Sequence, residues 1–368
     1  MNDTRKQIIF ISNPFGFGPT GKLYPIMQEM HKRLDCELIY FTGSLSSQII
    51  KADYLKYVQV DERSEEDIFN KLKDFPNAVV ISSLNRFAVK ASKRLNIPCA
   101  FIDGLSWLWD SIPEDFLSAD IYYALNFIGV DDKVKNYSQI KKVSYILDVE
   151  DLSQKEVRED FTLIHIGGFE NPLYISFENN YLNLLIEFLQ NIENQSKYIV
   201  VGGANAVQFV SERVDKKNFA FKTSGKAEFQ KLLKTCKHLI TTSGLTTTLE
   251  AFYAQTPVSF LLPSNLSQYK ILYLLAQKKL TSSFTTWDDY SPTKETIWNL
   301  SEKDALPLLD NLAKDLINSD TKRECFLKNM NVIINTVPDT NAQYKFINEL
   351  GVNGVSQIVD DLILKWNL

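Results

Sequence analysis

The chain has 368 residues, 45% of them hydrophobic, and a formal net charge of −5 at pH 7. This length and composition predict two α/β domains with complete hydrophobic cores. The acidic balance and the lack of a basic stripe argue against nucleic acid as the main partner.

Cysteine usage and hydropathy predict a cytoplasmic protein. The cysteines are scattered without metal-ligand spacing, so reduced thiols are expected at Cys36, Cys99, Cys236 and Cys325. The apolar run 8–11 is too short for a signal-peptide core, and no stretch approaches the ~20 apolar residues of a membrane span. A lipid partner would therefore be met at the membrane surface. Both a monomer and a homodimer fit this sequence.

The first half alternates short apolar runs with helical patterns, which predicts a parallel sheet with crossover helices. Strands are expected at 8–12, 37–41, 57–60, 78–82, 99–102, 121–125 and 144–147. Helices are expected at 21–34, 65–73 and 86–95, among others. A charged segment at 148–160 predicts a linker that ends a first domain over residues 1–155.

A glycine-rich segment follows the first expected strand. Gly16 and Gly21 have the spacing of a P-loop, but Leu23 replaces its Ser/Thr and Pro19 removes one N–H group. Gly16, Gly18 and Gly21 also fit the spacing of a dinucleotide fingerprint, which is a weak signal alone. Both kinds of nucleotide site stay as less favoured alternatives for this loop.

The second half repeats the same plan over residues 156–351. Strands are expected at 162–166, 198–201, 219–222, 238–241 and 258–262. A small or glycine-bearing turn follows each of the first four, at 167–168, 202–203, 224–225 and 243–244. Because ligands bind beyond the carboxyl ends of parallel strands, these turns predict a ligand-binding edge. The tail, 352–368, has the apolar spacing of an amphipathic helix.

The most informative segment is 242–251, Thr-Ser-Gly-Leu-Thr-Thr-Thr-Leu-Glu-Ala. A small turn opens a helix directly after an apolar strand, and the free N–H groups of a helix start suit a phosphate. The threonines add neutral hydroxyl donors. Glu250 lies further along the helix, where a carboxylate can accept hydrogen bonds from a ribose. The segment therefore predicts a site for a nucleoside diphosphate, although an ordinary strand–turn–helix would have the same pattern.

The pattern S-G-x-x-T-x-x-E-A, followed by Pro257, Pro263 and Gln268, resembles the donor-binding signature of GT-B glycosyltransferases. It is most similar to the lipid-II-forming N-acetylglucosaminyltransferases and the nucleotide-sugar glycosyltransferases of secondary metabolism. The chain departs from them at Thr242, where many members have histidine, and at Ile271 and Leu272, where Asn-Ala is common.

This resemblance implies two Rossmann-like, doubly wound domains facing across a cleft, with the C-terminal helix crossing back to the first. The first domain would bind an acceptor and the second a nucleotide sugar. The implied activity is metal-independent, inverting transfer of a hexose from a UDP- or dTDP-type sugar, which is the co-substrate, with no cofactor. The acceptor would be a small molecule, a lipid-linked molecule or a glycan.

The resemblance also implies roles for residues of the second domain. The diphosphate would be held by the glycine turn and its hydroxyls, the ribose by Glu250 and the sugar by Gln268. The complete set of expected donor-binding residues is Gly167, Gly168, Gly202, Gly203, Lys222, Thr223, Ser243, Gly244, Thr246, Thr247, Thr248, Glu250 and Gln268.

In the first domain, Gly21-Lys22-Leu23-Tyr24-Pro25 resembles the family's G-H-x-x-P, with Lys22 at the position of its catalytic histidine. A protonated lysine is a poor base, so Lys22 would hold an anionic acceptor or stabilise the leaving diphosphate. Asp103, at the end of a strand, becomes the main candidate base, and Asp110 the second. Asp103 could equally cap a turn.

The expected acceptor contacts are aromatic or polar residues near the carboxyl ends of the first-domain strands. Two tryptophans beside a carboxylate suit a flat or apolar acceptor, although core packing explains them equally well. The expected set is Phe15, Phe17, Gly18, Asn85, Arg86, Trp107 and Trp109.

No metal site is expected. His31, His165 and His238 form no triad spacing, and the chain contains no D-x-D motif. Two alternatives to a transferase remain open: a nucleotide-sugar hydrolase or epimerase of the same fold, and a non-catalytic protein that binds a nucleotide or glycan.

Overall fold

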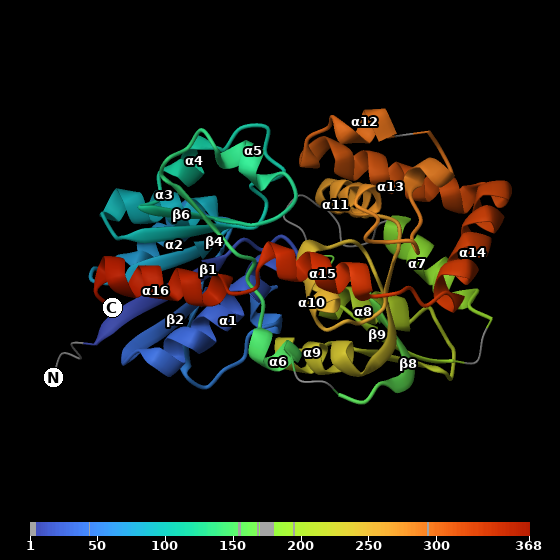
Figure 1. Ribbon diagram of the computed structural model, residues 1–368, viewed down its shortest axis with the longest axis horizontal. Coiled ribbons are helices and arrows are strands. Elements are labelled where there is room, and N and C mark those ends of the chain that lie inside the picture. Colours follow the sequence, from blue (N-terminus) through green and yellow to red (C-terminus); the bar gives the residue numbers. More distant parts are fainter. Residues whose placement is uncertain are drawn as a thin grey trace. The chain divides into compact units, whose positions relative to one another are not determined.

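The computed structural model describes residues 5–43, 45–153, 156–167, 169, 180–193, 196–292 and 294–368. The chain forms two compact units (Figure 1). Unit 1 contains Met1–Val149 and Asn348–Leu368, and unit 2 contains Glu150–Ile347. The first boundary precedes residue 155 because the following segment is tied to unit 2: Lys234 Nζ donates to the Asp151 carbonyl at 2.8 Å.

Unit 1 contains a seven-stranded parallel sheet with the strand order β3-β2-β1-β4-β5-β6-β7. Its strands read as continuous apolar runs, such as the buried Ile8, Ile9, Phe10 and Ile11, because helices cover both faces of a parallel sheet. The strands are β1 Lys6–Ser12, β2 Cys36–Thr42, β3 Leu55–Gln59, β4 Val79–Ser83, β5 Cys99–Asp103, β6 Ile121–Leu125 and β7 Ile140–Val143.

Helices connect these strands. The helices of this part of the chain are α1 Gly18–Arg33, η1 Ser46–Gln48, α2 Glu65–Leu72, α3 Arg86–Leu95, α4 Glu114–Leu117, α5 Val130–Val134 and α6 Val149–Ser153. The prediction of a strand at 144–147 is wrong. That apolar run is a buried loop with a single bridge from Ile146 to Asn353, whereas β7 precedes it.

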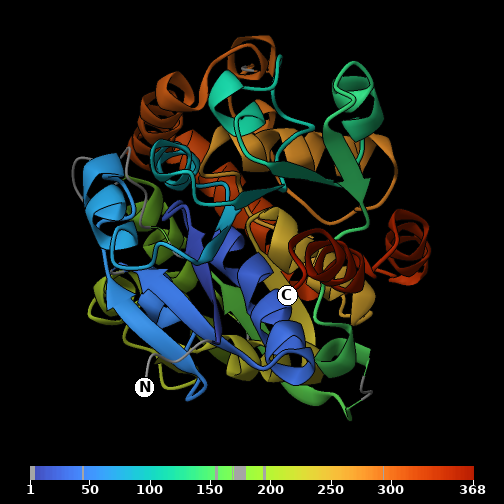
Figure 2. The same cartoon turned by 90° about the vertical axis from the view of Figure 1, so that its left-hand side faces the viewer.

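The C-terminal helix α16 (Gly354–Trp366) belongs to unit 1 and packs beside α1, as Figure 2 shows in dark red and blue. It buries Ile358, Val359 and Leu362. Asp361 fixes its position, because its carboxylate accepts from Tyr123 at 2.5 Å and from Lys141 at 2.6 Å. The amphipathic pattern of the tail therefore reports this packing face.

Unit 2 contains a five-stranded parallel sheet with the order β10-β9-β8-β11-β12. Its strands are β8 Glu159–His165, β9 Lys197–Val201, β10 Phe219–Lys222, β11 Cys236–Thr241 and β12 Val258–Phe260. In each sheet the chain fills one side first and then the other. The order therefore reverses between β1 and β4 in unit 1 and between β8 and β11 in unit 2, and ligands bind at such switch points.

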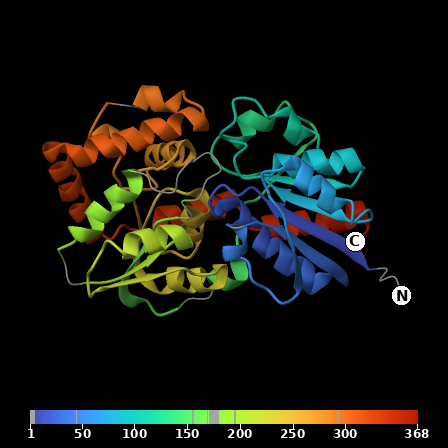
Figure 3. The same cartoon turned by 180° about the vertical axis from the view of Figure 1, so that it is seen from behind.

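The helices of unit 2 include a layer in which α7 packs against α13 and α8, seen in Figure 3. Within the described ranges, no helix is long and apolar enough to cross a membrane. The helices are α7 Asn180–Gln190, α8 Ala204–Ser211, α9 Lys226–Thr235, α10 Leu245–Tyr253, α11 Leu266–Gln277, η2 Trp287–Asp289, α12 Lys294–Trp298, α13 Glu302–Asn318, α14 Asp320–Asn335 and α15 Asn341–Leu350.

Candidate functional site

The switch point of unit 2 carries a polar pair at the strand ends. His165 ends β8 and Thr241 ends β11, and His165 Nδ1 lies 3.1 Å from Thr241 Oγ1. Burial, with a smaller contribution from the charge of Lys226, lowers the pKa of His165 to about 4. The imidazole is therefore neutral at pH 7, so it adds a polar group but no charge to this edge.

The turn after β11 leaves the start of α10 open. Gly244 is the N-cap residue of α10, and no side chain among the described residues caps this helix. A Cβ added at Gly244 would meet no atom of the described residues within 4 Å, and the same is true at Gly167, whose φ is +78°. The backbone N–H groups of a helix start can bind an anion that approaches through such open space.

Glu250 lies in α10 and is only 2% exposed. Its Oε1 accepts from Lys226 Nζ at the start of α9. Its Oε2 has no hydrogen-bond partner among the residues that the structure describes. Because buried polar atoms are nearly always hydrogen-bonded, this oxygen is ready to accept a hydrogen bond from a bound hydroxyl group.

Ser243 and Gln268 brace the turn internally. Ser243 Oγ donates to the main-chain oxygen of Gln268 at 2.7 Å. The side-chain oxygen of Gln268 accepts from the N–H and the hydroxyl of Ser264, at 2.9 and 3.0 Å. These atoms hold the loop before α11 against the turn before α10, and direct contact of either side chain with a donor stays a prediction.

The three threonines differ in exposure. Thr246 and Thr248 are buried, and Thr247 is half-buried. Thr248 Oγ1 has no partner within the described ranges. Their contact with a diphosphate also stays a prediction.

The other donor candidates divide into packing and surface residues. A Cβ at Gly202 would lie 2.5 Å from Ile166 Cγ1 and 2.8 Å from the Gly167 oxygen, so close packing requires this glycine. Gly203 N donates to that same oxygen at 2.9 Å. Lys222 pairs with Glu228 at 2.8 Å, and Thr223 is exposed. Gly168 lies outside the described residues.

Asp103 ends β5 as predicted, but its carboxylate is turned into unit 1 and is 0% exposed. It accepts from the Leu105 N–H at 2.6 Å, from Trp109 Nε1 at 2.8 Å and from the Tyr122 hydroxyl. Burial raises its pKa, although these donors and the nearby charge of Lys22 oppose the rise. The contacts describe a structural carboxylate, and its role as a base stays a prediction.

Lys22 lies beside Asp103, so the structure brings together two of the three catalytic candidates. Its side chain is buried, and its Nζ donates to the Gly18 carbonyl at 3.2 Å. A Cβ on Gly104 would come within 2.6 Å of Lys22 Cε, so Gly104 makes room for this lysine. The third candidate, Asp110, is fully exposed and lies 4.0 Å from Lys133.

Several acceptor candidates have structural partners. Asn85 is buried as the N-cap residue of α3, where its Oδ1 accepts from the Ala88 N–H at 3.1 Å, and its contact with an acceptor stays a prediction. Arg86 forms a surface ion pair with Asp115 at 2.5 Å. Trp107 is buried and donates to the Gly104 oxygen at 3.2 Å. Trp109 is half-buried and donates to Asp103. Phe15 and Phe17, in the loop after β1, and Gly18, the first residue of α1, are also half-buried.

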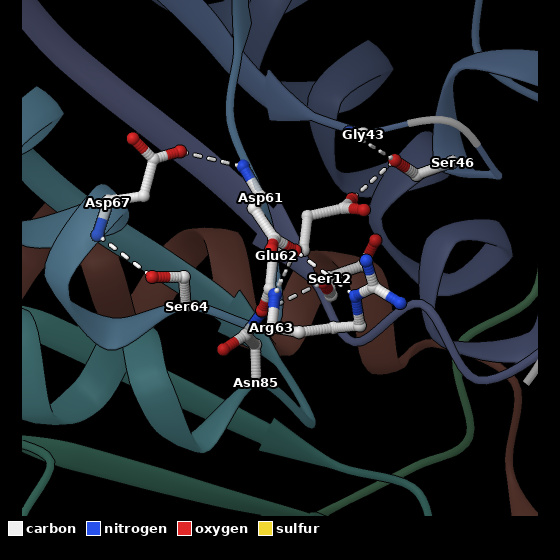
Figure 4. Close-up of polar contacts among 9 residues, drawn as sticks. All are labelled: Ser12, Gly43, Ser46, Asp61, Glu62, Arg63, Ser64, Asp67 and Asn85. Carbon is white, nitrogen blue, oxygen red and sulfur yellow. Dashed lines mark hydrogen bonds and ion pairs between the residues drawn. The ribbon is translucent and has the colours of Figure 1, made fainter. Parts of the chain in front are cut away.

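A second buried glutamate, Glu62, was not predicted from the sequence. Ser46 Oγ donates to its Oε1, and the main-chain oxygen of Glu62 accepts from Asn85 Nδ2 at 2.9 Å (Figure 4). The same amide donates to the Ser12 carbonyl at 3.0 Å, so it ties β1 to the loop after β3. Burial raises the pKa of Glu62 to about 7. A single glutamate between a strand and a helix carries no sequence signal for such a network.

Neither the cavity of unit 2 nor its metal-ligating residue types add a second candidate site among the described residues. A cavity of about 350 Å³ lies at the C-terminal end of α10, away from Gly244, but Lys234 is paired there with Glu156 at 3.0 Å and Arg158 with the Cys236 carbonyl at 2.8 Å. Over the described part of the chain, no group of three or more His, Cys, Asp and Glu side chains is placed to hold a metal ion.

No model of a known protein family matches the chain, and no curated protein matches it either. Solved structures do match. Os79 from O. sativa, in complex with U2F and trichothecene, is 11% identical with a TM-score of 0.59, covering 98% of this chain and 100% of that one. S. aureus MnaA, solved with UDP, is 12% identical with a TM-score of 0.51, covering 94% and 96%.

MurG from Acinetobacter baumannii is 13% identical with a TM-score of 0.50, covering 98% of this chain and 99% of that one. Identities this low establish the fold and not the activity. The prediction from the donor motif is confirmed at that level: the chain has the GT-B fold, with two Rossmann-like parallel-sheet domains.

Proposed function

We propose that this protein is a glycosyltransferase that uses a nucleoside diphosphate sugar as its donor. The observation that carries the proposal is the open start of α10 with the unpartnered Oε2 of Glu250 further along the same helix. Leu245 at the start of α10 and Glu250 are five positions apart, about 7.5 Å along the helix axis. N–H groups that suit a diphosphate and a carboxylate that suits a ribose therefore lie along one helix. UDP is the favoured nucleotide because the Os79 and MnaA structures contain it, and dTDP is the second choice.

In the proposed reaction, an acceptor hydroxyl or amine attacks the anomeric carbon of the sugar. The bond from that carbon to the diphosphate oxygen breaks, and the nucleoside diphosphate leaves with the electron pair. The N–H groups at the start of α10 and the hydroxyls of Thr246 and Thr247 would stabilise the leaving charge without a metal ion. Attack opposite the leaving group gives inversion.

Unit 1 would bind the acceptor, which we propose is a small molecule, a lipid-linked molecule or a glycan. Asp103 is the proposed base for the acceptor proton, with Lys22 beside it. Because Asp103 already accepts three hydrogen bonds, this role requires that Trp109 or Tyr122 releases the carboxylate when the acceptor binds. An Asp103→Asn variant that binds the donor and transfers at the parent rate would exclude this role.

The first experiment is isothermal titration of the full chain with UDP, dTDP, GDP, ADP and CMP. One diphosphate is expected to bind, and Glu250→Gln should weaken it by at least about tenfold, since each 1.4 kcal/mol is a factor of ten. Glu62→Gln is the matched control, because it makes the same change at a buried glutamate of unit 1 and should leave the affinity unchanged. No binding of any diphosphate would overturn the proposal.

Turnover separates the transferase from its alternatives. Release of nucleoside diphosphate from the matching sugar donor is measured with and without a panel of acceptors. Release that depends on an acceptor supports transfer. Release at full rate in water alone indicates a hydrolase or epimerase, and tight binding without release across all acceptors indicates a binding protein.

A further inference from the structure

The ion pair between Lys226 and Glu250 is the most deeply buried pairing of opposite charges in the described residues of the candidate site. Lys226 is the first residue of α9, directly after Gly225, and is 8% exposed. Its Nζ bonds to Glu250 Oε1, which links the start of α9 to α10. The sequence motif includes Glu250 but not Lys226.

Burying such a pair is costly unless the remaining hydrogen-bonding positions are satisfied. Here Oε2 of Glu250 is not satisfied by any described residue. An ion pair that served stability alone would be expected to satisfy both carboxylate oxygens. The arrangement instead fixes one oxygen with a cation and leaves the other available.

We propose that Lys226 is a positioning residue for nucleotide binding, which holds the Glu250 carboxylate so that Oε2 accepts from the ribose hydroxyls of the donor. This inference rests on the proposed function. Lys226 acts through Glu250 and not on the diphosphate. No atom of Lys226 lies within 4 Å of the Cβ position at Gly244, where the phosphates would approach α10.

The charged and titratable groups around Lys226 agree with this role. Glu250 faces it from α10, and His165 faces it from the end of β8. The His165 imidazole is neutral at pH 7, so it does not compete with Lys226 for the carboxylate. Lys226 is thus the cation that orients Glu250.

The test compares two ligands on the variant Lys226→Met by isothermal titration: the nucleoside diphosphate that binds the parent, UDP in the expected case, and its 2′,3′-dideoxy form. The affinity for UDP is expected to fall about tenfold, a usual coupling for groups in direct contact. The affinity for the dideoxy form should change less than about twofold, because it has no hydroxyl for Glu250. An equal loss for both ligands would overturn the proposal.

Lys234→Met is the matched control. Lys234 is also a buried lysine of α9 paired with a glutamate, Glu156, but it lies about 12 Å along the helix from Lys226. This variant should bind UDP like the parent. Lys226→Arg keeps the charge and is expected to recover most of the affinity.

The double variant Lys226→Met/Glu250→Gln covers the case in which Lys226→Met does not fold, because it removes both charges together. Its affinity for UDP should equal that of Glu250→Gln. A further loss in the double variant would mean that Lys226 contacts the nucleotide itself, which overturns the proposal. Failure of the parent to bind any nucleoside diphosphate would instead overturn the proposed function.

Discussion

The two units each bury a glutamate near the carboxyl edge of their sheet, but the two carboxylates have opposite surroundings. Glu62 in unit 1 is 3% exposed, and the neutral Ser46 hydroxyl donates to its Oε1. In unit 2, one carboxylate oxygen of Glu250 is paired with a lysine, and the other has no hydrogen-bond partner among the described residues. The Glu62 carboxylate holds a loop of unit 1, whereas Glu250 has one carboxylate oxygen available to accept a hydrogen bond from a ligand.

The glycines beside these residues differ in the same way. A Cβ at Gly43 would collide with Glu62 Oε2, whereas a Cβ at Gly244 would meet no described atom within 4 Å. In unit 1 side chains fill this part of the sheet edge, whereas the described residues of unit 2 leave space beside Gly244. Substitutions in unit 1 should therefore change stability, and substitutions in unit 2 should change binding.

Asp103→Asn should have the largest effect on stability. One carboxylate oxygen accepts from two donors, Trp109 Nε1 and the Tyr122 hydroxyl, and the other from the Leu105 N–H. An amide places its NH2 group against at least one of these donors and leaves both the donor and the NH2 group unsatisfied, so the free energy of unfolding should fall by about 4 kcal/mol at ~2 kcal/mol for each of these two buried groups. Urea unfolding measures it. Asp132→Asn, an exposed aspartate of unit 1, should change stability by less than about 0.5 kcal/mol.

Glu62→Gln should remove a pH dependence of stability. Because the pKa of Glu62 is raised from 4.5 to about 7, the folded state holds a proton that the unfolded state loses. The stabilisation is complete below pH 4.5 and is lost as the pH rises through 7, by up to about 3 kcal/mol. Relative to the parent, Glu62→Gln should therefore be similar at pH 4.5 and more stable at pH 8.

The difference in unfolding free energy between Glu62→Gln and the parent isolates the contribution of the Glu62 proton to stability. His165 and His238, with pKa values lowered to about 4, act with the opposite sign, because their stabilisation is lost as the pH falls below 6.5. These histidines are present in both proteins, so their effect cancels. A difference that is constant between pH 4.5 and 8 would contradict the prediction.

Gly43→Ala should destabilise unit 1 by about 2 kcal/mol, in the usual range for overpacking a closed site. The added methyl group would displace the Glu62 carboxylate and lie 3.3 Å from the Val60 carbonyl. Thermal unfolding of the variant measures the effect. Nucleotide affinity should stay at the parent value, and a variant as stable as the parent would show that this edge is looser than its contacts indicate.

Gly244→Ala should have the smallest effect on stability, within about 0.5 kcal/mol, because the methyl group would meet no described atom and Gly244 has a φ of −67° that alanine adopts freely. The substitution should nevertheless lower the affinity for the nucleoside diphosphate by about tenfold, since the methyl group occupies the approach to the α10 N–H groups. Paired measurements of unfolding and UDP binding test both parts. Unchanged affinity would move the phosphate site away from this turn.

Local pattern predicted most of the fold. The strands 121–125 and 219–222 and the helix 86–95 have the predicted bounds, because continuous apolar runs and an N-cap asparagine mark them in the sequence. The strand β7 was missed because Lys141 and Lys142 at the sheet edge are exposed and break the apolar run. The apolar run after it is buried for a different reason, beneath the C-terminal segment.

The candidate site was less predictable because its contacts join distant residues. Lys226 and Glu250 lie on different helices, and no sequence periodicity predicts that they pair. Asn85 was predicted to contact a ligand, although its place directly before a helical pattern is the ordinary signal of an N-cap residue. Side chains that cap and brace use the same residue types as side chains that bind.

The order of the chain has a consequence for its synthesis. The polypeptide passes from unit 1 to unit 2 within α6 and returns within α15, so unit 2 is a continuous stretch while unit 1 is assembled from both ends of the sequence. During translation, every residue of unit 2 emerges before α16, which unit 1 needs to cover α1 and β7. Unit 2 can thus reach its native state before the last helix of unit 1 has been synthesised.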